Sequence, residues 1–236
     1  MKIRWLGQGG FLVRDDAKTT EILVDPYLSD IVNRNGTCPR QHPVPIAPAD
    51  ITSDTVICTH DHLDHLDTGA IPEMPEDTFF VATYEGCDTL DKLGRHNHKA
   101  VREGDVLQIG GIRVMIVYAH HTCEAFGVIL EADGVRLYIS GDTLYDEKLF
   151  DFAAYRPDIT CICINGRMGN MNVEEAVVTA KKIGARLNIP DHYDMFASNA
   201  EDPAKFTREF PADAAFTPEF DREYDVLVEN CSVILR

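Results

Sequence analysis

The sequence has no long apolar run and no low-complexity tract. None of its apolar stretches approaches the roughly 20 uninterrupted residues that a membrane-spanning helix requires, so no membrane segment is expected. Residues 1–7 turn polar too early for the apolar part of a secretory signal. Internal repeats and long Gly/Ser linkers are also absent, which argues against a solenoid or a chain of flexibly linked modules. We therefore expect a cytoplasmic globular protein.

Paired cysteine motifs are missing as well. The chain contains seven cysteines, an odd number with no C-x-x-C pair, which does not fit a fully paired disulfide framework. Cys58, Cys161 and Cys163 lie inside apolar runs, where a free thiol behaves as a small hydrophobic residue. We interpret the cysteines as reduced packing residues of a protein in a reducing compartment.

Positive charge is scarce. Lys and Arg total 22 against 39 Asp and Glu, which gives a formal net charge of −17 with histidine neutral. Such an acidic protein repels phosphate backbones at long range and lacks the attraction that dominates non-specific nucleic-acid binding. We therefore expect no nucleic-acid partner, whereas a local positive pocket and the binding of cations remain compatible with the composition.

The remaining pattern alternates strands and helices, and the length fits a single domain over residues 1–236. Short apolar runs separated by turn residues predict strands at 2–6, 10–14, 21–25, 55–58, 79–82, 105–109, 112–118, 126–131, 135–139, 159–164, 186–189, 226–229 and 232–235. Helical patterns cover residues 84–93, 146–154, 173–183 and 203–209. The proline-rich residues 33–50 predict an irregular functional or interface loop. Helices available for both outer faces of the sheets predict stacked α/β layers.

One loop concentrates metal-binding side chains. The segment T-H-D-H-L-D-H at residues 59–65 holds three imidazoles and two carboxylates directly after an apolar strand pattern. Imidazole nitrogen and carboxylate oxygen are standard ligands of Zn²⁺ and similar ions. Such a loop, with His60 and His62 on one side and Asp64 and His65 on the other, can serve two adjacent metals. The alternative, a solvated polar loop, is much less favoured.

Further candidate ligands follow three other apolar runs. These residues are His120 with His121, Asp142, and His192. Ligands at the ends of several strands converge when those ends share one edge of the sheets, which is where α/β proteins place their sites. We therefore expect these side chains to join the histidine-rich loop in one site.

The motifs together resemble a known family. H-x-H-x-D-H at residues 60–65, His121 after a strand, S-G-D-T at 140–143 and the late His192 resemble the metallo-β-lactamase superfamily. Within it, W-L-G-Q-G-G at 5–10, Asp25-Pro26 and P-D-H-Y-D-M-F at 190–196 resemble the L-ascorbate-6-phosphate lactonase family and its small hydrolase relatives. The resemblance extends over about residues 2–206. It implies a four-layer αββα sandwich with a binuclear metal site.

The resemblance also implies a ligand set. The family pattern assigns one metal to His60, His62 and His121. It assigns the second metal to Asp64, His65 and His192, with Asp142 bridging the two. The pattern Ala-x-His favours His121 over His120, which then lies beside the ligands without being one.

The donor set restricts the choice of metal without settling it. No cysteine occupies a ligand position, so the site offers only nitrogen and oxygen donors, which suit Zn²⁺, Mn²⁺ or Fe²⁺. The lactonase resemblance points to Mn²⁺. We expect two divalent ions as cofactors.

A hydrolytic mechanism follows from such a site. Two metals about 3.5–4 Å apart lower the pKa of a bridging water enough to supply hydroxide near neutral pH. This hydroxide would open a small lactone or ester, with a phosphorylated sugar-acid lactone such as L-ascorbate 6-phosphate as the example, and Asp64 would orient it or accept its proton. Two alternatives stay open: a phosphodiesterase or nuclease of the same superfamily, and a metal-binding regulatory protein without turnover.

Candidate substrate contacts are fewer. Arg167 lies in a glycine-bearing loop before a helix N-terminus, where backbone N–H groups and a guanidinium can receive a carboxylate or phosphate. Asn165 in the same loop and Tyr193, next to the candidate ligand His192, are also predicted to contact the substrate. These contacts imply a small anionic substrate. A structural or surface role for Arg167 is an equal alternative, and a homo-oligomer is left open.

Two other features have simpler interpretations. G-x-G-G at residues 7–10 lacks the third glycine and the following helix of a dinucleotide fingerprint, so it predicts a tight turn between strands. The pair His96 and His98 has ligand spacing but stands between polar residues, which predicts exposed histidines. Trp5 is predicted to lie in the core.

Overall fold

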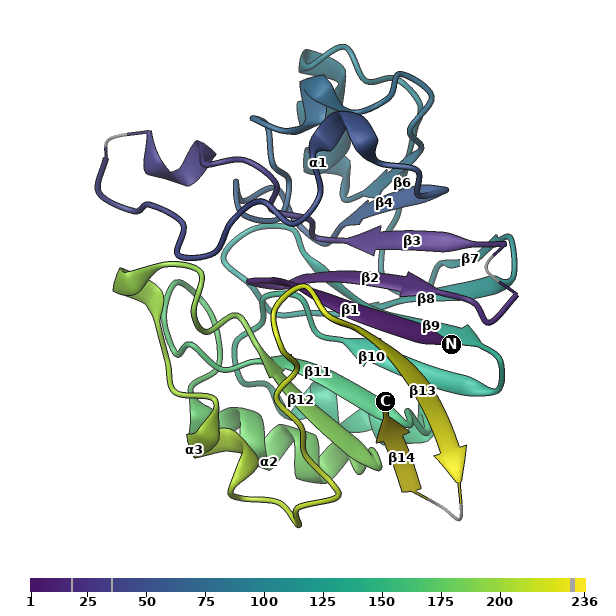
Figure 1. Cartoon of the computed structure of the whole chain (residues 1–236), viewed down its shortest axis with the longest axis vertical. Helices are drawn as coiled ribbons and strands as arrows, with labels where there is room; N and C mark the ends of the chain where they lie inside the picture. The colour runs from purple at the N-terminus through teal and green to yellow at the C-terminus, as the bar shows by residue number, and fades with distance from the viewer. Residues whose placement is uncertain (18, 35, 230–231) are drawn as a thin grey trace.

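Two β-sheets lie face to face at the centre of the molecule (Figure 1). The structure is a computed structural model, and it describes residues 1–17, 19–34, 36–229 and 232–236. The first sheet has eight strands in the order β14 (Ser232–Leu235), β13 (Glu223–Glu229), β1 (Lys2–Gly7), β2 (Gly10–Arg14), β3 (Glu21–Val24), β4 (Thr55–Cys58), β5 (Phe80–Ala82) and β6 (His98–Ala100). The second has six, in the order β12 (Leu187–Asp191), β11 (Ile159–Cys163), β10 (Val135–Ile139), β9 (Phe126–Ala132), β8 (Ile112–Tyr118) and β7 (Val106–Ile109).

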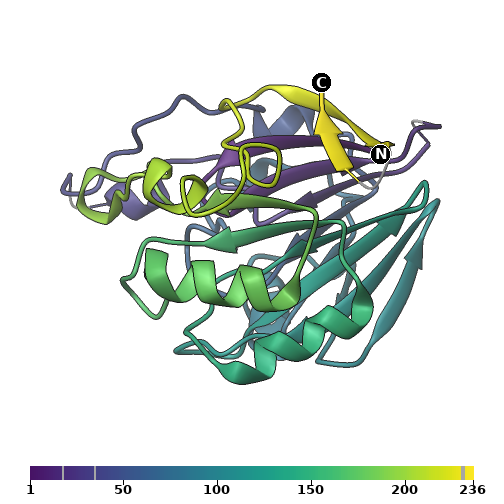
Figure 2. The same ribbon diagram turned by 90° about the horizontal axis from the view of Figure 1, so that it is seen from below.

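Helices cover the outer faces of both sheets. The longer ones are α1 (Tyr84–Lys92), α2 (Val173–Ile183) and the 3₁₀ helix η4 (Glu147–Tyr155). Short turns of helix are η1 (Ile31–Asn33), η2 (Pro48–Asp50), η3 (Ile71–Glu73), η5 (Ala197–Asn199) and α3 (Ala204–Thr207). Helices α2 and η4 contact each other on the outside of the second sheet (Figure 2). The layers therefore follow the order α, β, β, α, as the family resemblance of the sequence implies.

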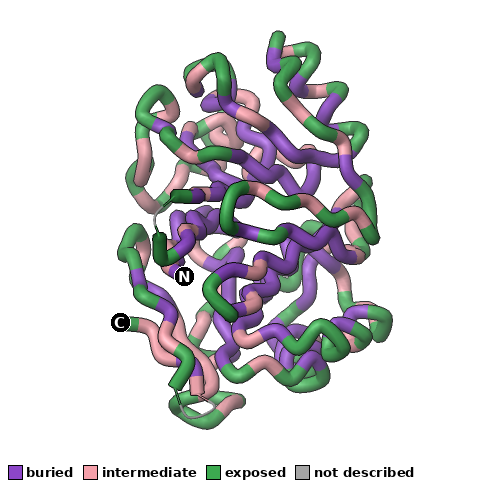
Figure 3. The backbone as a smooth tube through the Cα atoms, turned by 90° about the vertical axis from the view of Figure 1, so that its right-hand side faces the viewer, coloured by how far each residue is buried: buried purple, intermediate pink, exposed green. Residues whose placement is uncertain are grey.

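The strands alternate between two hydrophobic clusters. In β2, Phe11 and Val13 point into the core between the sheets, whereas Leu12 points to the outer face. That outer face packs against Cys87 and Leu90 of α1. Because successive side chains of a strand point to opposite faces, a sheet covered on both sides needs apolar residues at every position. Figure 3 shows the result: buried residues follow the strands, and exposed residues gather in the connections.

Sequence patterns predict most of these elements. The strands at 10–14, 55–58, 112–118 and 135–139 are observed with the predicted bounds. Helix α2 begins with the capping box of Asn172 and Glu175. Strand β6 was not predicted, because this three-residue edge strand is only partly buried and carries no apolar pattern.

The topology brings several strand ends to one edge. Strands β8 and β10 both run antiparallel to β9, so they are parallel to each other, and β10, β11 and β12 pair in parallel. The C-terminal ends of β8, β10 and β12 therefore share one edge of the second sheet. In the first sheet, β3 and β4 are also parallel and end together. No helix in the described part of the chain is long and apolar enough to cross a membrane.

Candidate metal centre

Three histidines form one donor set at this edge. His60 and His62 follow β4, and His121 follows β8. Nδ1 of His62 lies 3.1 Å from Nε2 of His60 and 3.2 Å from Nε2 of His121. Three ring nitrogens thus converge on one point, and the structure brings together the residues predicted for the first metal.

A second donor set lies beside the first. Nε2 of His65 is 3.4 Å from Nε2 of His192, which follows β12. Oδ2 of Asp64 is 3.7 Å from Nε2 of His65 and 3.6 Å from Nε2 of His192. These three residues are the ones predicted for the second metal.

Asp142 connects the two sets. Its Oδ2 lies 3.9 Å from Nε2 of His60 and 3.9 Å from Nε2 of His121. Its Oδ1 lies 3.3 Å from Nε2 of His65 and 3.2 Å from Nε2 of His192. One carboxylate oxygen therefore faces each donor set, which is the geometry expected of a bridging ligand.

The donor sets fit divalent cations. Oδ1 of Asp142 is buried and accepts no well-formed hydrogen bond from any described residue, although two imidazole nitrogens lie close to it. Buried carboxylate oxygens are normally satisfied, so this one is shaped for a partner other than a protein donor. A tetrahedron of metal–ligand bonds of about 2.1 Å has edges of about 3.4 Å, and the donor–donor distances of the two sets lie on either side of that value. Zn²⁺, Mn²⁺ and Fe²⁺ all accept such nitrogen and oxygen donors.

A compact turn holds the loop after β4. The backbone N–H groups of His65 and Leu66 donate to the carbonyl of His62. Asp67 accepts hydrogen bonds from the backbone N–H groups of Leu28 at 2.8 Å and Gly69 at 3.0 Å. Leu66 itself is buried in the outer hydrophobic cluster. The buried side chain of Leu66 and the hydrogen-bonded carboxylate of Asp67 together fix the direction of the neighbouring histidines.

Asp25 is a functional residue that the sequence analysis did not assign. Its Oδ2 lies 2.8 Å from Nδ1 of His65 and accepts a hydrogen bond from the Thr59 hydroxyl at 2.6 Å, while its Oδ1 accepts one from the Thr59 N–H at 2.7 Å. Asp25, His60 and His65 also lie close enough together to hold an ion, but Asp25 already bonds Nδ1 of His65. Asp25 therefore fixes the His65 ring so that Nε2 faces the cluster. The rule that ligands follow apolar strands would have found it, since Asp25 comes directly after β3.

The structure places His121, not His120, at the cluster. Nδ1 of His121 donates to the carbonyl of Gly169 at 3.0 Å, which turns Nε2 inward. A Cβ at Gly169 would lie 2.9 Å from the His121 ring, so this close approach requires glycine, whose φ of 94° also favours it. His120 is half-exposed, and its Nδ1 lies 3.4 Å from Asp146.

The electrostatics of the cluster favour positive charge in its second half. Burial lowers the pKa of His60 well below its ordinary value. Burial also opposes protonation of His65 and His192, but Asp142 and Asp64 outweigh it, raising the pKa of His65 strongly and that of His192 to about 10. Burial would raise the pKa of Asp142, yet His192 and His65 hold it well below its usual range. The carboxylates thus create a site in which a cation competes with protons.

A cavity of about 470 Å³ opens onto the donor sets. Donor residues in its lining are His62, Asp64, Asp142 and His192. Apolar residues in its lining are Val32, Leu63, Met168 and Phe196. Arg167 also lines it, and its Nη1 donates to the backbone carbonyls of Asn165 and Ala200, both at 3.1 Å. No described carboxylate lies within ion-pair distance of this guanidinium, so its charge is available to a ligand.

Two predicted substrate contacts lie outside this cavity lining. Tyr193 is buried with its ring stacked on Trp5 at 4.9 Å between centroids, because its side chain points into the core. Asn165 is buried and donates to Oδ1 of Asn199 at 2.9 Å and to the Arg167 carbonyl at 3.3 Å. Tyr193 thus packs in the core, and Asn165 supports the Arg167 loop, so the structure does not bring either side chain into the cavity lining with Arg167.

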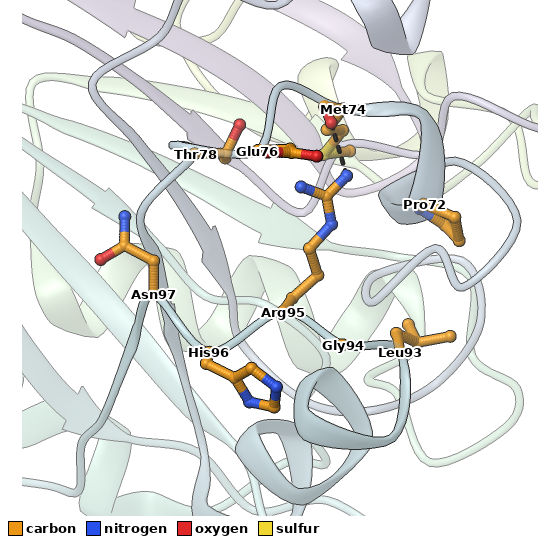
Figure 4. Close-up of a pocket in the computed structure, with 9 residues that line it drawn as sticks. All are labelled: Pro72, Met74, Glu76, Thr78, Leu93, Gly94, Arg95, His96 and Asn97. Carbon is orange, nitrogen blue, oxygen red and sulfur yellow. Dashed lines mark hydrogen bonds between the residues drawn. The ribbon is translucent and has the colours of Figure 1, made fainter.

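A larger cavity of about 570 Å³ lies elsewhere, between η3 and the loop before β6 (Figure 4). Among the described residues that line this cavity, Arg95 is the one nearly buried cation. Its guanidinium donates to the backbone carbonyls of Ile71, Met74 and Pro75. These three hydrogen bonds use the guanidinium to connect η3 with the loop before β6. This cavity contains none of the donor residues.

The converging donors at one edge of an αββα sandwich define a metal centre of the metallo-β-lactamase type. The family model described as the beta-lactamase superfamily domain matches residues 20–193, and the chain belongs to this superfamily. The resemblance found in the sequence is thereby confirmed at the level of the superfamily and its fold.

Individual relatives agree with this assignment. A UPF0173 metal-dependent hydrolase of Oenococcus oeni is 28% identical over 95% of this chain and 100% of its own length. Igni18, a metallo hydrolase of Ignicoccus hospitalis, is 22% identical with a TM-score of 0.75 over 94% of this chain and 96% of its own. An isothiocyanate hydrolase from Delia radicum gut bacteria is 16% identical with a TM-score of 0.77 over 94% and 98%.

Proposed function

We propose that this protein is a metal-dependent hydrolase that holds two divalent ions and cleaves a small anionic ester or lactone. The observation that carries the proposal is Asp142, whose two oxygens face two separate donor sets at the floor of one cavity. The names of the curated relatives, which are metal-dependent hydrolases, support the same reaction class.

The chain's own residues divide the work of such a reaction. Bound cations would supply Lewis acidity and a water of lowered pKa. Asp64 lies at the cavity wall with Oδ2 beside the second set, where it can orient a water or accept its proton. Arg167 stands in the same lining with an unpaired charge, so it can bind the anionic group of a substrate. Val32, Leu63, Met168 and Phe196 give the same cavity an apolar wall that can pack against the carbon skeleton of a substrate.

The substrate is proposed at the level of a chemical class. A phosphorylated sugar-acid lactone such as L-ascorbate 6-phosphate combines a hydrolysable ring with an anion for Arg167, which makes it the first compound to test. Isothiocyanates enter the panel because a structural neighbour hydrolyses them. Phosphodiesters form the second candidate class, and the net charge of −17 disfavours nucleic acids among them.

Turnover with defined metals tests the proposal. The protein would be stripped of metal, reloaded with Mn²⁺, Zn²⁺ or Fe²⁺, and assayed on lactones, esters, isothiocyanates and phosphodiesters, with metal content measured in parallel. We expect two ions per chain and hydrolysis that needs them. Tight metal binding without turnover of any compound would favour the regulatory alternative, and hydrolysis that survives complete metal removal would contradict the proposal.

We further propose that the chain forms a single domain over residues 1–236, works in the cytoplasm and has no nucleic-acid partner, with a homo-oligomer left open. Size-exclusion chromatography with light scattering measures the oligomeric state directly.

A further inference from the structure

Gln8 reaches the second donor set from the turn between β1 and β2. Its Nε2 lies 2.7 Å from Oδ2 of Asp64 and 2.9 Å from Nε2 of His192. The residue is only 1% exposed. The sequence analysis treated residues 7–10 as a turn and gave no role to this side chain.

The backbone holds Gln8 in an unusual conformation. Its φ is 52°, in the left-handed region that a glutamine rarely adopts, and it follows Gly7 with a φ of 89°. The Gln8 carbonyl accepts hydrogen bonds from the Trp5 indole at 3.0 Å and from the His192 backbone N–H at 3.1 Å. The turn is therefore fastened both to the core and to the loop that carries His192.

The chemistry of the two contacts distinguishes them. A carboxylate oxygen only accepts hydrogen bonds, so the atom beside Asp64 is the amide nitrogen and Gln8 donates. The same oxygen has further lone pairs, so Asp64 can accept this bond and still ligate a cation. An imidazole nitrogen has one lone pair, so Nε2 of His192 cannot accept a hydrogen bond from Gln8 and ligate a metal ion at the same time. The bond to Asp64 is the one that persists when a cation is bound.

We propose that Gln8 is a positioning residue of the second metal site: its amide N–H holds Asp64 in the orientation in which Oδ2 faces His65 and His192. Asp64 lies within the turn closed by the bonds from His65 and Leu66 to His62, and it is partly exposed at the cavity, unlike the fully buried His65. Without the Gln8 bond, its carboxylate would be free to turn into the cavity. Among the described residues, the first set, formed by His60 and His62 with His121, receives no hydrogen bond from the Gln8 side chain.

Site-resolved metal binding tests this role. Gln8→Leu removes the donor at similar volume, and Gln8→Ala removes the side chain. Outer hydrogen-bond partners of metal ligands contribute about 10–100-fold to affinity, so we expect the second binding step for Mn²⁺ or Zn²⁺ to weaken by about that factor while the first is unchanged. Calorimetry with parallel metal analysis resolves the two steps.

Two further variants make the outcome decisive. Gln8→Glu replaces the donor with a carboxylate opposite Asp64, and we expect the second step to weaken at least as much. The matched control is Gln108→Ala, which removes an exposed amide that donates to the Gly110 carbonyl at 2.8 Å, and it leaves both steps unchanged.

Three results overturn the proposal: an unchanged second step in Gln8→Leu, equal weakening of both steps, or tighter binding in Gln8→Glu, which would make residue 8 an oxygen ligand instead. The proposal rests on the metal centre described above. Because cation binding is measured without a substrate, the role of Gln8 can fail while hydrolysis stands, and hydrolysis can fail while this role stands.

Discussion

The two halves of the metal centre use similar side chains in opposite electrostatic settings. The first set contains three histidines, and burial lowers the pKa of both His60 and His121. The second set adds Asp64 to two histidines, and its carboxylates raise the pKa of His65 and His192 despite their burial. Although both halves bring three donor side chains together, they differ in whether the surroundings favour neutral or protonated histidine.

The outer contacts differ in the same way. The first set is supported by neutral groups, the Thr59 hydroxyl beside His60 and the Gly169 carbonyl on His121. The second is supported by the Asp25 carboxylate on His65 and by the Gln8 amide on Asp64. A cation in the second half would therefore lie among more negative charge than one in the first, and the substitutions below test what this difference does.

The largest effect is expected from Asp142→Ala, because this residue alone belongs to both halves. We predict that both binding steps weaken by more than about 100-fold, the upper effect of an outer partner alone, and that hydrolysis is abolished while the fold stays largely intact. Metal content per chain and the rate on the best substrate are measured together. Full activity in this variant would remove the basis of the bridged centre.

Single-set variants should separate the halves. We predict that His62→Ala abolishes the first binding step and His192→Ala the second, while each abolishes hydrolysis and leaves the fold largely intact. Circular dichroism checks the fold, and metal analysis counts the ions. His120→Ala is the control, since His120 lies outside both sets, and its binding should match the wild type. Loss of both ions in His62→Ala would mean that the halves are not independent.

A smaller, one-sided effect is expected from Asp25→Asn. The change replaces the carboxylate that orients His65 with an amide. The amide NH₂ group would then face the Thr59 or His65 group that donated to Asp25, and that hydrogen bond would be lost. We predict a second step weaker by about 10–100-fold, with the first step close to the wild type. Equal weakening of both steps would assign Asp25 to the whole loop rather than to His65.

The smallest effect is expected from Gly9→Ala. A Cβ there would lie 3.0 Å from Cε1 of His65, so the ring must yield by a few tenths of an ångström. We predict a modest weakening of the second step and a loss of about 1 kcal/mol in the free energy of unfolding, at the low end of overpacking costs. Denaturant unfolding measures the stability, and an affinity unchanged at both steps would show that the ring shifts freely.

Much of the fold and of the ligand set was predictable because the signals are local. The β-branched and apolar run T-V-I-C at residues 55–58 fits a buried parallel strand. The capping box of Asn172 and Glu175 marks the start of a helix within four residues. His60, His62, Asp64 and His65 occur together in one loop, so their chemistry is visible without any tertiary contact. The short edge strand β6 carries no such local signal, which is why it was missed.

The amino-acid sequence by itself determined the layers, the nitrogen and oxygen donors and their places at strand ends, since periodicity and residue type are properties of neighbouring positions. Only the tertiary structure decided which oxygen of Asp142 faces which set, that Asp25 and Gln8 support the second set, and that Tyr193 points into the core. These outcomes depend on strand pairing between distant segments and on the direction of each side chain at a turn. A local pattern encodes neither, because both are set by contacts that form when the sheets pack together.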